Sequence, residues 1–142
     1  MRDVRIAESD QDILECHPVM VQLRPHHGDA GAFLAQVRRQ QARCGFALAF
    51  VRDAGAVVAV AGFRIDEMLS RGLYMYVDDL VTDARHRSRG FGDALMDWLA
   101  ARARAAGCTM LVLDSGVHRA AAHRFYFRKR MEIRAFNFGM RL

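Results

Sequence analysis

The stretch "YVDDLVTDARHRSRGFGDALMDWLA", residues 76–100, restricts the fold of this chain more than any other part of the sequence. It continues an apolar run, 73–82, whose two alternating faces both carry apolar residues, as in a central strand covered on both sides. An arginine-rich loop follows, and apolar residues at helical spacing then predict a helix to about Ala106. A buried strand connected in this way to an amphipathic helix indicates the α/β class.

The loop itself has the spacing R-x-x-G-x-G, formed by Arg87, Gly90 and Gly92 directly before the helix. N–H groups at a helix start lack intrahelical acceptors, and the helix dipole favours negative charge there. Glycines also let an anion approach the backbone closely. The loop therefore predicts a phosphate site. Asp93 and Asp97 support the alternative of a solvated loop, because acids in the first turns compete with a bound anion.

Two common phosphate-binding motifs are excluded. The dinucleotide fingerprint requires a third glycine or alanine where Leu95 stands, and a P-loop requires a Gly-Lys-Ser/Thr that does not follow. The net charge of +5, carried almost entirely by arginine, is compatible with nucleic acid, an acidic surface or a phosphorylated small molecule. The chain has no recognition-helix pattern or aromatic–basic ribbon, so we do not expect a nucleic-acid partner.

The rest of the chain predicts the remaining elements of a mixed sheet. Ser9, with Asp12 three residues later, predicts an N-cap, whereas Pro18 and Pro25 predict that 18–28 is irregular or a broken helix. The elements expected in chain order are a strand at 3–9, helices at 10–17 and about 28–44, strands at 46–52, 56–65 and 73–82, the helix after the loop, a buried strand at 109–115, a helix at 119–130 and a final strand. We therefore predict one domain, 1–142, with an α/β fold: a mixed, mostly antiparallel sheet with helices on both faces.

Composition indicates the cellular compartment of the protein and the kinds of site that it can contain. No apolar run approaches the roughly 20 residues of a membrane span, and the first residues show no signal-peptide core. The three cysteines form no CxxC pair, and the histidines form no i,i+4 pair. We predict a cytoplasmic protein with no membrane span, no disulfide framework and no metal site.

With its flanking strand, the loop resembles the GNAT superfamily of acyl-CoA-dependent N-acyltransferases. In that family the motif (Q/R)-x-x-G-x-(G/A) follows a central strand, opens a long helix and holds the coenzyme A pyrophosphate on backbone amides. The resemblance continues through the strand at 109–115 and the segment "HRFYFRKRM", which is similar to the family's Phe/Leu-Tyr segment. The motifs match over about 73–131, and the order of elements matches over roughly the whole chain.

The resemblance implies which residues contact acetyl-CoA, the acyl-donor substrate. The pyrophosphate would be bound by Arg87, Ser88, Arg89, Gly90, Phe91 and Gly92. The backbone of Leu80, Val81 and Thr82 would pair with the pantetheine arm. One amide there, of Leu80 or Val81, would polarise the thioester carbonyl, on which negative charge develops during attack.

Tyr126 matches the family's general acid, which protonates the departing thiolate. A phenol suits this role because its reference pKa lies near 10. Helical spacing alone would favour a packing aromatic beside Phe125 and Phe127, and only the resemblance reverses that interpretation. Two positions depart from the family. Arg119 stands where Asn is frequent and could still contact coenzyme A phosphates, whereas Arg130 replaces a glycine and puts the turn after this helix in question.

Two acids on the central strand are candidates for the base that deprotonates an amine acceptor. Alternation predicts that Asp78 and Asp79 point to opposite faces. We favour Asp78, because related polyamine-type family members place an acid at the matching position, with Asp79 second. Structural pairing of one or both with arginines is an equally acceptable interpretation.

We therefore predict an acetyl-CoA-dependent N-acetyltransferase that acts on a small-molecule or peptide amine by direct attack in a ternary complex. The alternative is a non-catalytic module of the same fold that binds acyl-CoA or regulates a partner. About 12 residues after Arg130 are too few for the two strands that usually end the family's fold. We expect a bent or bulged single strand there, or completion of the sheet by a second chain in a homodimer.

Overall fold

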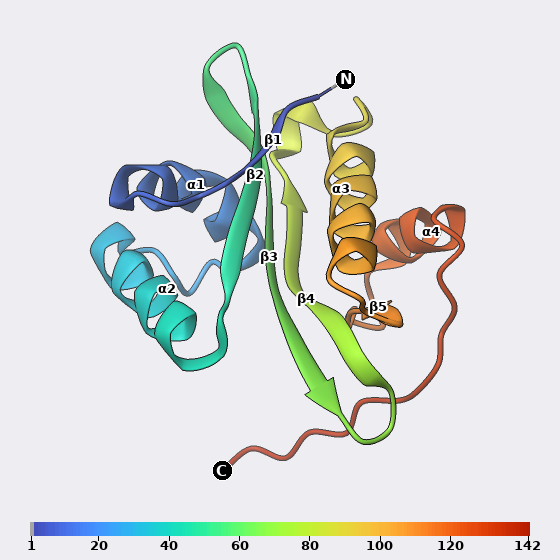
Figure 1. Ribbon diagram of the computed structural model, residues 1–142. Helices are drawn as coiled ribbons and strands as arrows, with labels where there is room; N and C mark the ends of the chain where they lie inside the picture. Colours follow the sequence, from blue (N-terminus) through green and yellow to red (C-terminus); the bar gives the residue numbers. More distant parts are fainter. Residues whose placement is uncertain (1) are drawn as a thin grey trace. The chain divides into compact units, whose positions relative to one another are not determined.

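The computed structural model describes residues 2–142, which form two compact units. The first unit ends at Val112, and the second begins at Leu113. The first unit contains a five-stranded open sheet in the order β1-β2-β3-β4-β5 (Figure 1). Its strands are β1 (Val4–Ile6), β2 (Ala47–Asp53), β3 (Ala56–Met68), β4 (Gly72–Thr82) and β5 (Met110–Val112). All neighbours pair antiparallel except β4 and β5, which are parallel. The predicted mixed, mostly antiparallel sheet is confirmed.

Helices cover both faces of this sheet. α1 (Asp10–Leu23) and α2 (Ala30–Cys44) lie on one face, and α3 (Phe91–Ala105) lies on the other (Figure 1). An apolar core cluster packs α1 and α2 against β2, β3 and β4 through buried residues that include Ile13, Met20, Phe33, Phe50 and Val81. Burial of these side chains is the main source of stability for the unit.

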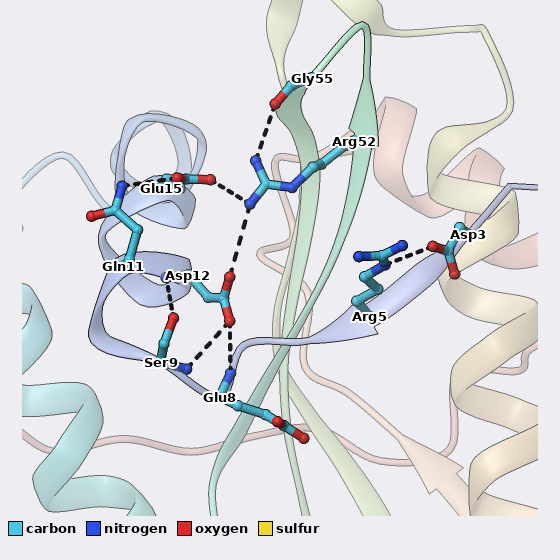
Figure 2. Close-up of polar contacts among 9 residues, drawn as sticks. All are labelled: Asp3, Arg5, Glu8, Ser9, Gln11, Asp12, Glu15, Arg52 and Gly55. Atoms are coloured by element: carbon cyan, nitrogen blue, oxygen red, sulfur yellow. Dashed lines mark hydrogen bonds and ion pairs between the residues drawn. The ribbon is translucent and has the colours of Figure 1, made fainter.

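The start of α1 is fixed by a reciprocal cap, as the sequence predicts. The Asp12 N–H donates to Ser9 Oγ at 3.1 Å, and the Asp12 carboxylate accepts from the Ser9 N–H at 3.2 Å (Figure 2). Arg52 of β2 bonds Glu15 of α1 and the Gly55 carbonyl oxygen, so the same side chain ties the helix to the β2–β3 turn (Figure 2). The cap and the arginine together fix where α1 crosses the sheet.

The prediction that the chain becomes irregular at Pro18 is wrong. α1 continues without interruption to Leu23, with Pro18 inside it. A proline in a helix removes one backbone hydrogen bond and crowds the preceding turn. Here the cost is offset because the residues around it, Cys16, Val19 and Met20, are buried in the core.

Two turns that the sequence marks with glycine adopt left-handed backbone. Gly45 ends α2 with φ +67° and its N–H donates to the carbonyls of Gln40 and Gln41. Ala54 and Gly55, with φ of +49° and +85°, form the two-residue turn between β2 and β3. Positive φ at both central residues suits a tight hairpin, because its twist matches that of the strands.

β5 is shorter and less buried than expected. The sequence predicts a buried strand at 109–115, whereas only Met110–Val112 pair with β4, opposite Tyr74–Tyr76. All three β5 residues are half-buried. The strand has β4 on one side and, among the described residues, no strand on the other.

The second unit, Leu113–Leu142, contains α4 (Ala120–Arg128) followed by residues 132–142, here called the tail. The strand that the sequence predicts in the tail is absent: these residues are irregular and exposed. α4 ends in a left-handed turn at Arg130, with φ +61°. The Met131 N–H donates to Tyr126 O and the Arg130 N–H to Phe127 O. This pair of hydrogen bonds is a Schellman motif, in which the residue with left-handed backbone is usually glycine. The motif therefore accounts for the glycine that the resembled family has at the position of Arg130.

Candidate functional site

The loop between β4 and α3 presents the backbone that the phosphate hypothesis requires. Ser88 and Gly90 both have left-handed backbone, with φ of +60° and +82°. Gly90 is the N-cap of α3 and supplies no side-chain cap. The N–H groups of the first helical residues, Phe91 and Gly92, therefore have no intrahelical acceptor. Successive left-handed turns and an open helix start together form a concave set of N–H groups that suits an anion.

Asp83 anchors the start of this loop. It is buried, with 3% of its surface exposed. Gln22 of α1 donates from Nε2 to Asp83 Oδ1 at 2.8 Å, and His86 Nδ1 lies 2.5 Å from Asp83 Oδ2. These side-chain hydrogen bonds, that of Gln22 first, lower the pKa of Asp83 to about 2. Gln22 also accepts from the Ala84 N–H at 3.0 Å. The side-chain amide of this α1 residue therefore binds the loop through both its nitrogen and its oxygen.

Four arginines lie in or against the loop, and they are engaged differently. Arg85 pairs with Asp83 at 3.3 Å. Arg89 pairs with Asp53 of the β2–β3 turn at 2.9 Å. Arg2 donates to the Arg89 carbonyl oxygen and lies over the Phe91 ring, 3.7 Å from its centroid. Arg87 is exposed and makes no side-chain hydrogen bond or ion pair with the described residues. Arg87 is therefore the cation most available to a phosphate, and Arg2 is a second cation near the start of α3 that the sequence analysis did not single out.

The outer edge of β4 is open beyond its short pairing with β5, which stops at Tyr76. The Asp83 N–H donates to Val58 O on β3 at 2.8 Å. Because alternate residues of a strand direct their N–H groups to the same side, Val81 also faces β3, whereas Leu80 and Thr82 face the open edge. The resemblance implies that the amide of Leu80 or Val81 polarises the thioester carbonyl. The register favours Leu80, because its N–H faces the open edge.

A β-bulge in β4 changes the predicted orientation of the two candidate acids. Gly62 of β3 pairs with Asp79, but the next residue, Phe63, pairs with Val77, so Asp78 is the extra residue. Asp79 points toward Gly62, since a Cβ placed there would lie 2.5 Å from its Oδ2. Arg64, two residues along β3 and therefore on the same face as Gly62, donates to Asp78.

The expectation that the two carboxylates point to opposite faces is therefore wrong. A bulge inserts one residue without a cross-strand partner, and this interrupts the strict alternation of a strand. Asp78 and Asp79 both face the side of the sheet that α1 covers. Simple alternation could not reveal this, because the bulge is visible only in the pairing of β4 with β3.

Both carboxylates are held by arginines. Arg24, the C-cap of α1, donates from Nε to Asp79 Oδ1 at 2.8 Å and from Nη2 to the Asp78 carbonyl oxygen at 2.9 Å. Arg64 Nε lies 3.2 Å from Asp78 Oδ1. Burial raises the pKa of Asp78, and the neighbouring Asp79 charge adds to the rise, while Arg64 opposes it. A raised pKa makes the Asp78 carboxylate a stronger base than an ordinary aspartate side chain.

Tyr126 and Arg119 belong to the second unit and are described within it. Arg119 is the N-cap of α4, and Tyr126 lies two turns further along the helix. The Tyr126 ring packs edge-on against Phe125, with centroids 5.6 Å apart. Burial raises the pKa of the Tyr126 phenol, and the charge of Arg119 opposes the rise. The phenol is therefore protonated at neutral pH, as a proton donor must be.

Sequence reasoning did not anticipate several residues that shape this region. They are Arg2, Gln22, Arg24, Arg64 and Asp83. Gln22 and Arg24 fall in the segment predicted as irregular, so their helical placement could not be inferred. Asp83 directly follows the β4 run and precedes the arginine-rich loop, and an acid at that junction is a signal that could have marked it as a loop anchor.

Two searches of the described residues concern other classes of site. Residues 2–142 contain no group of three or more His, Cys, Asp or Glu side chains arranged to hold a metal ion. No helix in the same range is both long and apolar enough to cross a membrane.

Comparison with known proteins relates this geometry to one family. A family model described as the acetyltransferase (GNAT) family matches residues 10–131. An uncharacterized N-acetyltransferase, YhdJ, of Bacillus subtilis (strain 168) is 31% identical over 121 residues, which cover 85% of this chain and 84% of the relative.

Solved structures agree with the fold. A putative acetyltransferase from Agrobacterium tumefaciens superposes with a TM-score of 0.81 at 25% identity and covers 99% of each chain. The aminoglycoside N-acetyltransferase AAC(6')-Iy, solved in complex with CoA, superposes with a TM-score of 0.84 at 17% identity, covering 100% of this chain and 95% of its own.

Proposed function

The chain belongs to the acetyltransferase (GNAT) family, and on that premise we propose that it transfers an acetyl group from acetyl-CoA to a primary amine by direct attack in a ternary complex. The observation that carries the proposal is the open start of α3, where Ser88 and Gly90 adopt left-handed backbone beside the free guanidinium of Arg87. An N-acetyltransferase needs this region to hold a diphosphate, and the residues present fit that group.

On the donor side, the loop residues 87–92 bind the pyrophosphate through backbone N–H groups, and Arg87 adds charge-assisted hydrogen bonds. The open edge of β4 at Leu80–Thr82 takes the pantetheine arm as an added strand. The Leu80 N–H then polarises the thioester carbonyl, which gains negative charge as the amine attacks. Arg119 of α4 adds a further cation toward the coenzyme A phosphates.

On the acceptor side, an alkylammonium must lose a proton before it can attack. We assign this step to Asp78, whose raised pKa suits a base, with Asp79 as the second candidate. Arg64 and Arg24 support the competing interpretation, in which both acids are structural ion pairs. For Asp78 to act as the base, the incoming cation must displace Arg64.

The chemical step then balances as follows. The neutral amine nitrogen attacks the thioester carbonyl carbon, the C–N bond forms and the C–S bond breaks. The electron pair of the C–S bond leaves on the coenzyme A sulfur, and the Tyr126 O–H supplies the proton that this thiolate takes up. Of the two protons that the alkylammonium loses, the first passes to the Asp78 carboxylate before attack and then to water. The second leaves the nitrogen as the C–N bond forms and passes through water to restore the Tyr126 phenol. The products are an N-acetylated amine and free coenzyme A.

The test is thiol release from acetyl-CoA in the presence of a panel of small amines, aminoglycosides and peptide N-termini. Tyr126→Phe should lower kcat by about 10²–10⁴-fold with little change in coenzyme A affinity, since general acid catalysis contributes in that range. Asp78→Asn should lower kcat and flatten the acidic limb of the pH profile. Phe125→Leu is the control on α4, because it changes the packing partner of Tyr126 and leaves the phenol in place.

The result that would reject the enzymatic proposal is coenzyme A binding without thiol release for any amine. That outcome would favour the alternative, a non-catalytic acyl-CoA-binding module of the same fold. Full turnover by Tyr126→Phe would remove the acid role from that residue and leave the reaction class intact.

A further inference from the structure

Four charged side chains lie together on the face of the sheet that α1 covers, and they alternate in sign. They are Arg24, Arg64, Asp78 and Asp79, here called the charge cluster. Arg64 bonds Asp78, and Arg24 bonds Asp79 and the carbonyl oxygen of Asp78. Side-chain exposures of 28% for Arg64 and 22% for Asp78 place this pair partly out of water but within reach of a small molecule. A charge at such a depth costs free energy unless an opposite charge pairs with it.

Arg24 is the fixed cation of the charge cluster. It is the C-cap of α1, where its N–H donates to the Met20 carbonyl oxygen at 2.9 Å and its own carbonyl oxygen accepts from the His27 N–H at 3.0 Å. Its guanidinium contacts both acids of β4, one through the carboxylate and the other through the backbone. Because backbone and side chain are both held, an incoming ligand meets Arg24 in the position that the structure shows.

Arg64 is the cation that an acceptor amine must displace. Its Nε lies 3.2 Å and 3.3 Å from the two Asp78 carboxylate oxygens, which is longer than a strong charge-assisted hydrogen bond. Its Cζ lies 4.7 Å from the ring centroid of Tyr76, its cross-strand partner. An ammonium that binds Asp78 takes the carboxylate away from this arginine. Asp66, 3.9 Å from Arg64 Nη1, is a weak substitute because more than half of its side chain is exposed.

The sum of charges in the cluster then decides which amines fit. Two guanidinium groups and two carboxylates sum to zero. A simple alkylammonium adds one positive charge, and a diamine or an aminoglycoside adds two or more beside two arginines. A molecule with one ammonium and one carboxylate adds none, and its carboxylate pairs with the guanidinium that its ammonium displaces. A phosphate dianion in place of the carboxylate would leave a net negative charge, so a carboxylate is the better match.

We propose that the acceptor is an amino acid-like molecule whose primary amine and carboxylate are both bound by the charge cluster. The amine binds Asp78, and the carboxylate binds the Arg64 guanidinium and further N–H groups of Arg24. A guanidinium has five donors in a planar fork that matches a carboxylate, so Arg24 keeps its bonds to Asp78 and Asp79 while it binds the ligand. The inference rests on the proposed function, since it names the acceptor of that acetyl transfer. The ligand carboxylate takes no part in the transfer, and the products are an N-acetylated amino acid and coenzyme A.

The first experiment compares acceptors that differ only in the carboxylate. The common amino acids, β-alanine and γ-aminobutyrate are each paired with their own carboxamide, and 1,3-diaminopropane represents the diamines. For the best amino acid, kcat/KM from thiol release should exceed that of its carboxamide and of the diamine by about tenfold or more, the effect of one hydrogen-bonded ion pair. The carboxamide is the matched control, because it keeps the amine and the side chain and removes only the negative charge.

Arg64→Gln should have opposite effects on the two ligands of a pair. Loss of the guanidinium removes the partner of the ligand carboxylate, so kcat/KM for the amino acid should fall by about tenfold or more. The same change leaves Asp78 open to the amine, so the carboxamide should react at least as well as with the unsubstituted chain. Arg64→Lys keeps a cation and should retain most of the preference. A merely structural role of Arg64 would instead lower both ligands together, and that result overturns the inference.

Arg38→Gln is the control for the loss of one positive charge. Arg38 pairs with Asp10 at the start of α1, whereas Arg24 lies at the end of that helix. The substitution should leave kcat/KM for both ligands of a pair unchanged. Circular dichroism checks that each variant is folded, and the comparison of matched ligands with the unsubstituted chain decides the question independently of any variant.

Calorimetry separates a failure of this inference from a failure of acetyl transfer. With free coenzyme A bound, the amino acid should bind about tenfold or more tightly than its carboxamide, and Arg64→Gln should remove the difference. If this holds while no amine releases thiol, the reaction is rejected and the ligand class stands. Thiol release from carboxamides or diamines that equals release from amino acids overturns the inference and leaves acetyl transfer intact, as does a preference that Arg64→Gln leaves unchanged. Absence of both thiol release and amino acid binding rejects both.

Discussion

Single side chains in this protein take conformations or charges that their neighbours impose. Asp83 is the clearest case, because a carboxylate that is 3% exposed stays ionised only through its donors, Gln22 and His86. Arg130 is another, since an arginine occupies the left-handed position that usually belongs to glycine. Each of these residues has a measurable consequence for stability.

Asp83→Asn should destabilise the protein near neutral pH, and the deficit should disappear in acid. The folded-state pKa of Asp83 is lowered from 3.8 to about 2, so the unfolded chain binds a proton more tightly. The stabilisation is complete above the unfolded pKa and is lost as pH falls through the folded one. Thermal unfolding of both proteins from pH 6 to pH 2 measures this. An equal deficit across that range would contradict the assignment. Gln22→Ala should show the same trend with smaller amplitude.

Arg130→Gly should stabilise the end of α4. A non-glycine residue in left-handed backbone costs about 1–2 kcal/mol, and glycine returns about 0.5–1 kcal/mol of that as chain entropy. We expect a net gain of about 0.5–1 kcal/mol, seen as slower hydrogen exchange of the amides at 130 and 131. Gly107, with φ +82° after α3, is the reciprocal control. Gly107→Arg should lose a similar amount, and a gain there would show that φ is not the cause.

At the scale of elements, the bulge in β4 positions the two carboxylates that are candidates for the base acting on the amine acceptor. It turns Asp78 toward Arg64 and Asp79 toward Arg24, both on the face that α1 covers. Gly62 makes this possible, because Asp79 and the Phe46 ring occupy the space that a side chain would fill. A sheet that lacked this glycine would have to move either the core aromatic or the carboxylate.

Gly62→Ala should therefore destabilise the protein by about 1–3 kcal/mol, the usual cost of overpacking a core position. The added Cβ would lie 2.5 Å from Asp79 Oδ2 and 2.6 Å from Phe46 Cζ, closer than real contacts allow. Urea unfolding measures the loss. Gly28→Ala is the control, since a Cβ at Gly28 meets nothing within 4 Å. Equal effects of the two substitutions would contradict the packing argument.

Across the whole molecule, local signals predicted most of the fold, and they failed where pairing between distant segments decides the outcome. The Ser9 cap, the strands at 46–52 and 56–65 and the start of α3 at Phe91 follow from residues within a few positions of each other. The bulge at Asp78 depends on the register of β4 against β3, and the missing strand in the tail depends on which edge is available. For the candidate site, the loop followed from its own residues, whereas the roles of Tyr126 and the acids came from family resemblance and stay predictions.

Coenzyme A binding should raise the thermal stability of the molecule if the loop works as proposed. At 100 times its dissociation constant, a ligand that binds only the folded state adds about 2.7 kcal/mol. For a chain of 142 residues this corresponds to a rise in Tm of about 10 °C. Arg87→Ala removes a charge-assisted hydrogen bond worth about 1.5 kcal/mol, which lowers affinity roughly tenfold and halves the rise at the same ligand concentration.

Arg104→Ala separates this effect from a loss of overall positive charge. Arg104 lies in the last turn of α3, at the opposite end of the helix from the loop. Its removal changes the net charge as much as Arg87→Ala does, so a general electrostatic attraction would weaken equally in both variants. If the loop binds the diphosphate locally, Arg104→Ala should keep the full rise in Tm with coenzyme A. Equal losses in the two variants would place the anion site elsewhere, because the start of α3 would then have no special share in binding.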